Sequence, residues 1–145
     1  MTALLQLPPQ TVLTIELPGE PRGKGRPRFS RQSGRTYTDG ATREYETNLR
    51  VLAGHVMGGR VPFQGALIVR VEAYFQPPAS WSGKKRLAAQ AGLVHHTTRP
   101  DADNLVKMLD ALNTVVWLDD KQIVDLQLIK SYSDRPRYVI EVRAL

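Results

Sequence analysis

The segment from Ala66 to Gln76, with the sequence ALIVRVEAYFQ, constrains the fold more strongly than any other part of this chain. Arg70 and Glu72 alternate with apolar residues, so the segment fits an extended strand with one apolar side. The side chains on that side are Leu67, Val69, Val71, Ala73 and Phe75. Pro77 and Pro78 end the strand, because proline cannot donate a hydrogen bond to a sheet. The pattern predicts a sheet with one face covered and the other polar.

The other repeating patterns predict an α+β chain. Alternation of β-branched residues predicts strands at residues 11–17, 35–38, 123–132 and 137–143, the last two as an antiparallel pair. Helical spacing predicts helices at residues 41–57, 84–91 and 101–116, and the glycine-, proline- and arginine-rich residues 18–34 are expected to form a long mobile loop. The third helix has the apolar stripe Leu105, Leu109, Leu112 and Val116. We expect a single domain over residues 1–145, with a small mixed β-sheet flanked by helices on one face.

The chain contains no cysteine, which excludes disulfides and thiolate metal sites. A metal site must therefore use oxygen or histidine ligands. No apolar run reaches the roughly 20 residues that span a bilayer, and the N-terminal residues do not resemble a signal peptide. We expect a soluble, cytoplasmic protein with no membrane partner.

The positive charge is concentrated in one segment. The net charge is +6, from 20 basic and 14 acidic residues, and six basic residues with no acid lie between Arg22 and Arg35. Subtracting these six leaves 14 basic and 14 acidic residues, so the remainder is neutral. Such a cluster is typical of a surface that binds a polyanion, although a solvated basic loop is the alternative. Residues 101–125 have the opposite bias, with six acids and two lysines. Acids are tolerated near DNA phosphates where a cation lies between them.

Asp101 and Asp103 stand at the start of the third predicted helix. Pro100 disfavours helical backbone at the residue before it, so the helix begins just after. A helix N-cap explains one of these aspartates well and two less well. Lys107, four residues after Asp103, shares its helix face, which fits an ordinary ion pair or an active-site lysine. A straight helix over residues 101–116 spans about 24 Å, so Asp120 reaches Asp101 only if the helix ends early or the next strand doubles back.

Several aspartates with one nearby lysine suit a hard divalent cation. Magnesium prefers oxygen ligands, and in phosphodiester hydrolysis it polarises the phosphate and activates a water. A calcium-binding EF-hand loop is disfavoured, because Val106 and Leu112 occupy the positions that need glycine and glutamate. His95 and His96 are adjacent and would point to opposite faces of a strand, so they make a poor zinc pair.

Three short motifs follow one another between residues 99 and 124. They read RPDADNLVK at 99–107, DAL at 110–112 and WLDDKQIV at 117–124. In this combination they resemble the RusA family of Holliday-junction resolvases, and the sequences at 25–28 and 37–38 are similar to the N-terminal segment of many phage-type members. The resemblance implies a RusA-like fold and an Mg²⁺-dependent, homodimeric endonuclease, with Mn²⁺ able to substitute. It places the metal-binding carboxylates on Asp101, Asp103 and Asp120, with Asp119 as an adjacent ligand, and the essential lysine on Lys107.

The function that the resemblance implies is resolution of four-way DNA junctions by paired, symmetric phosphodiester cuts in recombination and repair. A four-way junction has a two-fold axis, and a C₂ dimer supplies two identical sites with matching symmetry. The expected DNA-binding residues are Arg22, Lys24, Arg26, Arg28, Arg31, Arg35, Lys84, Lys85, Arg99 and Lys130. Two alternatives stay open: a metal-dependent nuclease acting on other branched or single-stranded DNA, and a non-catalytic nucleic-acid-binding protein. A bacterial or phage-encoded origin is expected.

Overall fold

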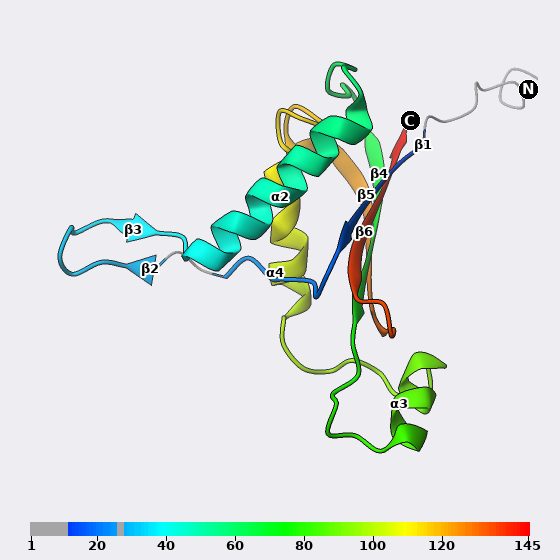
Figure 1. Cartoon of the computed structure of the whole chain (residues 1–145). Helices are drawn as coiled ribbons and strands as arrows, with labels where there is room; N and C mark the ends of the chain where they lie inside the picture. Colours follow the sequence, from blue (N-terminus) through cyan, green and yellow to red (C-terminus); the bar gives the residue numbers. More distant parts are fainter. Residues whose placement is uncertain (1–11, 26–27) are drawn as a thin grey trace, which may run out of the picture.

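A four-stranded mixed β-sheet forms the centre of the structure, a computed structural model that describes residues 12–25 and 28–145 (Figure 1). Its strands are β1 (Val12–Pro18), β4 (Leu67–Phe75), β5 (Ile123–Tyr132) and β6 (Arg137–Ala144). They lie in the order β1-β6-β4-β5, with β5 parallel to β4 and the other neighbours antiparallel. The predicted α+β class with a mixed sheet is confirmed.

Strand β4 lies inside the sheet, with β6 on one side and β5 on the other. Its predicted inward residues are all 4% exposed or less, while the residues between them are half-buried. Val71, for example, lies opposite Ile140 of β6 and Leu128 of β5. These cross-strand apolar neighbours explain why the alternating pattern of this segment predicts its burial correctly.

Helices α2 (Gly40–Met57) and α4 (Ala102–Lys107) lie against one face of the sheet, and α3 (Gly83–Gln90) lies beyond the end of β4 (Figure 1). The predicted limits of the first helix are confirmed. Asp39 caps its N-terminus by accepting a backbone N–H at 2.8 Å, and Gly58 ends it in the left-handed conformation, with φ 59°. No helix in the described parts of the chain is long and apolar enough to cross a membrane.

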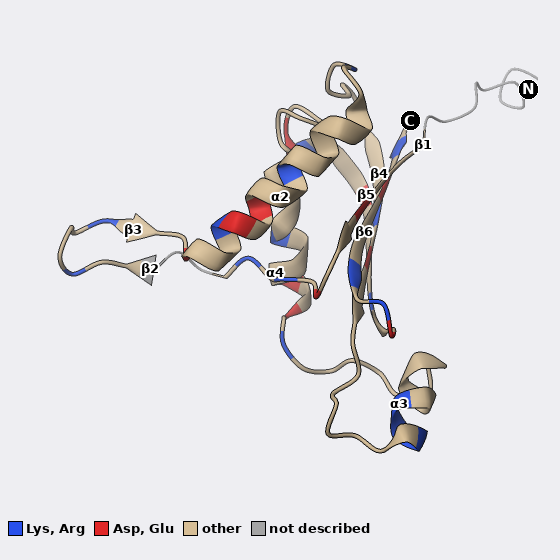
Figure 2. Cartoon of the chain, in the orientation of Figure 1, with Lys and Arg blue, Asp and Glu red and all other residues tan. Residues whose placement is uncertain are grey.

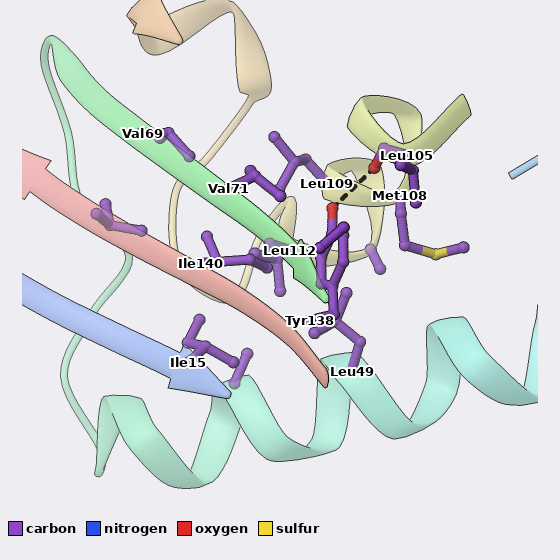
Figure 3. Close-up of a cluster of buried hydrophobic side chains, with 14 of the residues drawn as sticks. Ile15, Leu49, Val69, Val71, Leu105, Met108, Leu109, Leu112, Tyr138 and Ile140 are labelled. Carbon is purple, nitrogen blue, oxygen red and sulfur yellow. Dashed lines mark hydrogen bonds between the residues drawn. The ribbon is translucent and has the colours of Figure 1, made fainter. Parts of the chain in front are cut away.

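The hydrophobic core fills the space between the sheet and these two helices. Figure 3 shows Leu49 of α2 and Leu105 of α4 in one buried cluster with Ile15, Ile140 and Tyr138 from the strands. The buried Tyr138 hydroxyl donates a hydrogen bond of 2.7 Å to the Leu105 carbonyl. The buried Tyr138 hydroxyl therefore has a hydrogen-bond partner, and this bond links α4 directly to β6.

β5 and β6 do not form the antiparallel pair that the sequence predicts, because β4 lies between them. The chain leaves β5, crosses the end of β4 and returns as β6. The Ser133 N–H donates to the Phe75 carbonyl at 2.8 Å, which holds this connection on the end of β4. An exposed strand edge leaves backbone groups unpaired. The apolar strand β4 avoids this because it lies inside the sheet, with a paired strand on each edge.

The third predicted helix, over residues 101–116, is wrong in length. Helix α4 ends at Lys107, and a 3-10 helix, η1 (Met108–Leu112), follows it. Thr114 then adopts the left-handed conformation, with φ 68°. The predicted apolar stripe is nevertheless buried throughout, with Leu105 on α4, Leu109 and Leu112 on η1, and Val116 in the segment that follows.

Tertiary contacts explain the early end of this helix. The Arg50 guanidinium of α2 donates to the Asn113 carbonyl and to the Thr114 hydroxyl, both at 2.7 Å. The Asn113 side chain in turn accepts the Trp117 indole N–H at 2.7 Å. These contacts supply hydrogen-bond partners at the end of the helix, where further helical turns would otherwise have supplied them.

Residues 28–37 form a hairpin where the sequence predicts mostly loop. Strand β2 (Arg28–Phe29) pairs with β3 (Thr36–Tyr37), and Gly34 takes a φ of 68° in the turn. This hairpin, the β-arm, projects away from the sheet (Figure 1). The predicted DNA contact Arg26 and the side chain of Arg28 lie outside the described residues.

Candidate active site

An open groove of about 750 Å³ lies where the chain enters α4. Its charged lining residues are Arg22, Arg99, Asp101, Asp103 and Lys107. Figure 2 shows acidic residues at the start of α4 next to a basic residue in the adjoining loop. The groove thus joins two of the predicted metal-binding carboxylates to the predicted lysine and to two predicted DNA contacts.

Asp101 occupies the N-cap position of α4, with φ −65° and ψ 150°, yet its side chain accepts no capping hydrogen bond from the described helix. Asp39 and Asp119, by contrast, both accept backbone N–H groups at their helix starts. Asp103 is 71% exposed, and its carboxylate lies 3.7 Å from the Lys107 ammonium. Helix capping therefore does not occupy the Asp101 carboxylate, and both carboxylates are accessible to a ligand.

The basic segment at residues 21–25 lies directly against the start of α4. The Lys24 N–H donates to the Asn104 carbonyl at 2.9 Å. A Cβ atom at Gly23 would lie 2.8 Å from Cβ of Pro100 and 3.0 Å from Cβ of Asn104, so only glycine fits this close approach. The basic segment therefore forms one wall of the groove, and the acidic start of α4 forms the other.

Gln122 fixes the double-aspartate turn before β5. Its carboxamide oxygen accepts the N–H groups of Leu118 and Asp119, at 2.9 and 3.0 Å. Its NH₂ group donates to the carbonyls of Phe63 and Gly65, at 2.9 and 3.0 Å. Both ends of the carboxamide are thus fully used. The motif at 117–124 contains Gln122, but spacing alone assigns it no role, and only the folded chain shows that it anchors the turn.

Asp120 lies beside a second carboxylate, Asp110 of η1. A hydrogen bond with Asp110, burial and the neighbouring Asp119 together raise the pKa of Asp120 from its ordinary value of 3.8 to about 6. The Asp110 carboxylate also lies 3.7 Å from the Lys24 ammonium. Two carboxylates in contact disfavour each other's ionisation, an arrangement that a proton or a cation relieves.

The predicted metal ligands lie in two groups. Asp101 and Asp103 line the groove, whereas Asp120 lines a separate hollow with Val106 and Leu109 at the edge of the sheet. Within the described residues, no three Asp, Glu or His side chains form a cluster that could hold a metal ion. The early end of α4 does bring Asp120 back alongside the helical segment, which is the first of the two routes that the sequence leaves open.

The Asp101–Asp103 pair by itself fits Mg²⁺. Magnesium commonly binds through one or two carboxylates and keeps several of its waters. Both side chains supply hard oxygen donors, both are exposed, and the basic side chains around them attract a phosphate to the same groove. The chemistry of this donor set therefore suits a hard divalent cation shared between the protein and a nucleic-acid phosphate.

The family model for Endodeoxyribonuclease RusA matches residues 18–143 of this chain. The chain belongs to the RusA endodeoxyribonuclease family. It is therefore a nuclease, and the non-catalytic alternative is set aside. The chain is also 37% identical over 129 residues to the uncharacterized protein YqaN of Bacillus subtilis (strain 168), a match that covers 86% of this chain and 91% of that protein.

Two basic residues in or next to the groove, Arg22 and Lys24, have partners within the protein. Arg22 reaches the Asp39 carboxylate at 3.1 Å. The Lys24 ammonium lies 3.5 Å from Glu46 and 3.7 Å from Asp110. These contacts tie the basic segment to α2 and η1, which is a structural role that the charge pattern alone does not reveal.

The other basic residues predicted to bind DNA lie mainly on projecting elements. Arg31 and Arg35 are exposed on the β-arm, and Lys84 and Lys85 are exposed on α3. The Lys85 ammonium lies 4.0 Å from the centre of the Trp81 ring. Figure 2 shows the β-arm and α3, both with Lys or Arg positions, on opposite sides of α4.

Lys130 has different partners from those expected of a DNA contact. Its ammonium donates to the carbonyls of Thr98 and Pro100, at 2.7 and 2.8 Å. Burial lowers the pKa of Lys130, and the negative charge of Asp101 opposes this effect. Lys130 thus supports the loop that leads into α4.

Proposed function

We propose that this RusA-family nuclease is an Mg²⁺-dependent endonuclease that resolves four-way DNA junctions by paired, symmetric cuts. The observation that carries the proposal is the pair of exposed carboxylates, Asp101 and Asp103, in a groove whose other charged lining residues are basic. Acids within a basic groove fit a cation held between protein and phosphate. Membership of the RusA family, which acts on branched DNA junctions, supports the choice of substrate.

The carboxylates would share the binding of one or more cations. Asp101 and Asp103 would hold Mg²⁺ from the groove side, and Asp120, with Asp119 beside it, would supply a third carboxylate from the separate hollow that it lines. When bound, the ion polarises the phosphate and activates a water. Mn²⁺, which accepts the same oxygen ligands, substitutes for it.

Lys107 would stabilise negative charge on the phosphate in the transition state. Its ammonium is half-exposed and lies 3.7 Å from the Asp103 carboxylate, a distance typical of a weak surface ion pair. Such a contact is readily exchanged for a phosphate oxygen. A fixed cation directed at developing charge is among the strongest contributions that a protein makes to catalysis.

The exposed basic side chains would position the DNA. Arg99 and Arg22 line the groove, Arg31 and Arg35 extend along the β-arm with Arg26 and Arg28 nearby in sequence, and Lys84 and Lys85 lie on α3. Contacts of this kind go to phosphates and carry little sequence information. Basic elements on both sides of the carboxylates suit a substrate whose strands diverge there.

We further propose that the chain acts as a homodimer. A four-way junction resolves only if two symmetric strands are cut, and the described part of one chain presents a single groove lined by Asp101, Asp103 and Lys107. A C₂ dimer supplies the second site in the matching orientation.

Replacing Asp103 by asparagine tests the catalytic proposal. We expect junction cleavage to fall by about 10²–10³-fold, while junction affinity stays equal or increases because a charge that repels phosphate is removed. Asp134→Asn is the matched control, since Asp134 is exposed in the β5–β6 connection. Cleavage that survives both Asp101→Asn and Asp103→Asn would contradict the proposal.

The substrate is tested separately by measuring affinity for a four-way junction, a flap, a single strand and a linear duplex at one salt concentration. A resolvase prefers the four-way junction. Equal affinity for all four, or preference for the flap or single strand, would favour a metal-dependent nuclease of another substrate class.

A further inference from the structure

Lys130 connects strand β5 to the loop in front of α4. It pairs with Ala73 of β4, whose side chain is fully buried on the helix-covered face, so Lys130 lies on that same face. From there its ammonium donates to two main-chain carbonyls, Thr98 at 2.7 Å and Pro100 at 2.8 Å. Hydrogen bonds from a charged donor at these distances are among the stronger ones in proteins.

These two carbonyls flank Arg99, and Asp101 follows directly. Both Arg99 and Asp101 line the groove. Residues 97–100, just before the Asp101 N-cap of α4, contain no helix or strand, so the main-chain hydrogen bonds of regular structure do not hold this stretch. The clamp by Lys130 therefore acts at the point where the chain presents one basic and one acidic side chain to the groove.

The surroundings of Lys130 restrict it to this position. The Phe75 ring lies 5.9 Å from the ammonium, and the His96 ring stacks on Phe75 with 3.9 Å between the ring centres. The Asp101 carboxylate is close enough to attract the ammonium electrostatically. Removing a partly buried ammonium leaves two carbonyls without their donor and Asp101 without a neighbouring positive charge.

We propose that Lys130 is a positioning residue for the nuclease reaction. It fixes the backbone on both sides of Arg99, and so sets the direction in which the Asp101 carboxylate enters the groove. The proposal rests on the role assigned above to Asp101, and it assigns to Lys130 no contact with DNA or with the reacting phosphate.

The test compares Lys130→Met, Lys130→Gln and Lys130→Arg with the wild type. Gln127→Met is the matched control, because Gln127 lies on the same strand and its side chain contacts Arg70 on the opposite face of the sheet. For Lys130→Met we expect single-turnover junction cleavage to fall by about 10–100-fold, with more Mg²⁺ needed for half-maximal rate. Junction affinity without metal should stay within about two-fold. Lys130→Gln should lie between Met and the wild type, and Lys130→Arg should recover most of the rate.

A second readout does not depend on cleavage. Amide hydrogen exchange in the metal-free protein should become faster for residues 98–104 in Lys130→Met and Lys130→Gln, and stay unchanged in Gln127→Met. Unchanged exchange together with a wild-type cleavage rate would overturn the proposal. A loss of junction affinity with an unchanged rate at saturating DNA would also overturn it, and would make Lys130 a DNA contact. If the wild type itself cleaves no DNA, the proposed function fails, while the exchange data still decide whether Lys130 orders this loop.

Discussion

At the scale of single residues, the two adjacent aspartates of the RusA motif have opposite surroundings. Asp119 accepts the Lys121 N–H, and this bond lowers the pKa of the Asp119 carboxyl. Asp120 meets Asp110 instead, which raises its pKa to about 6. The difference between two identical side chains follows from the local turn, which gives Asp119 the Lys121 N–H, and from the fold, which places Asp110 beside Asp120.

The raised pKa of Asp120 predicts a pH-dependent gain in stability for Asp120→Asn. Between its ordinary pKa of 3.8 and about 6, the folded state binds more protons than the unfolded state, so the contribution of Asp120 to stability falls as the pH rises. Asparagine resembles the protonated form. In EDTA, Asp120→Asn should therefore unfold at a higher temperature than the wild type at about pH 8 and at a similar temperature at about pH 3, which lies below both pKa values.

The gain at the higher pH should stay below about 1 kcal/mol, because solvent screens this largely exposed group. Asp134→Asn serves as the control for a general effect of removing one negative charge. An equal shift at both pH values, or a loss of stability at the higher pH, would contradict the assignment of repulsion between Asp110 and Asp120.

At the scale of elements, the short α4 is the feature that matters most for the site. A continuous helix over residues 101–116, as local spacing predicts, would carry Asp120 about 24 Å away from Asp101. Contacts from Arg50 and Trp117 end the helical segment early, and the chain returns along it. The local sequence favours helix through residue 116, and only side chains from elsewhere make stopping at Leu112 more favourable.

The β-arm predicts a specific effect on DNA binding. Arg31→Ala combined with Arg35→Ala should weaken junction binding and reduce the salt slope by about one for each phosphate that the arm no longer neutralises. Thermal stability should change little, because the arm projects from the sheet (Figure 1). Affinity measured over a range of salt concentrations provides the test.

Arg143→Ala is the matched control, since Arg143 is exposed on β6 and pairs with Glu141 on the same strand. Its salt slope should equal that of the wild type. A double arm variant with an unchanged slope would remove the β-arm from the DNA interface.

At the scale of the whole molecule, the two faces of the sheet differ: one is covered by helices, and the other carries charged side chains of the strands. The helices lie against one face, and the groove lies among the segments of that side, while ion pairs such as Arg70–Glu72 and Arg143–Glu141 lie on strands of the sheet. Strand alternation places these charged residues opposite the buried ones. The predicted catalytic residues thus depend on how helices and loops meet above the covered face.

Metal binding should stabilise the whole folded chain. An ion that binds only the native state raises its stability by about 2.7 kcal/mol at 100 times the dissociation constant. Adding Mg²⁺ to the DNA-free wild type should therefore raise its Tm, measured by differential scanning calorimetry. The double variant Asp101→Asn, Asp103→Asn should lose this shift, and Asp134→Asn should keep it. Equal shifts in all three proteins, matched for ionic strength, would show that Mg²⁺ does not bind at these carboxylates.

The sequence by itself determined most local features of this protein. The buried side of β4, the helical segments of α2 and α3, the apolar stripe after Asp101 and the Asp103–Lys107 pair depend on residues close together in the chain, so their spacing predicts them. The RusA motifs likewise predicted the family.

Tertiary structure decided the features that depend on distant segments. It placed β4 between β5 and β6, ended α4 early, set Asp120 against Asp110, and turned Lys24 and Lys130 toward internal partners. Each outcome depends on contacts between residues far apart in sequence, such as Arg50 with Asn113 or Lys130 with Thr98. Local sequence preferences do not include such contacts. The candidate carboxylates could therefore be predicted from the sequence, whereas the residues around them could be identified only from the folded structure.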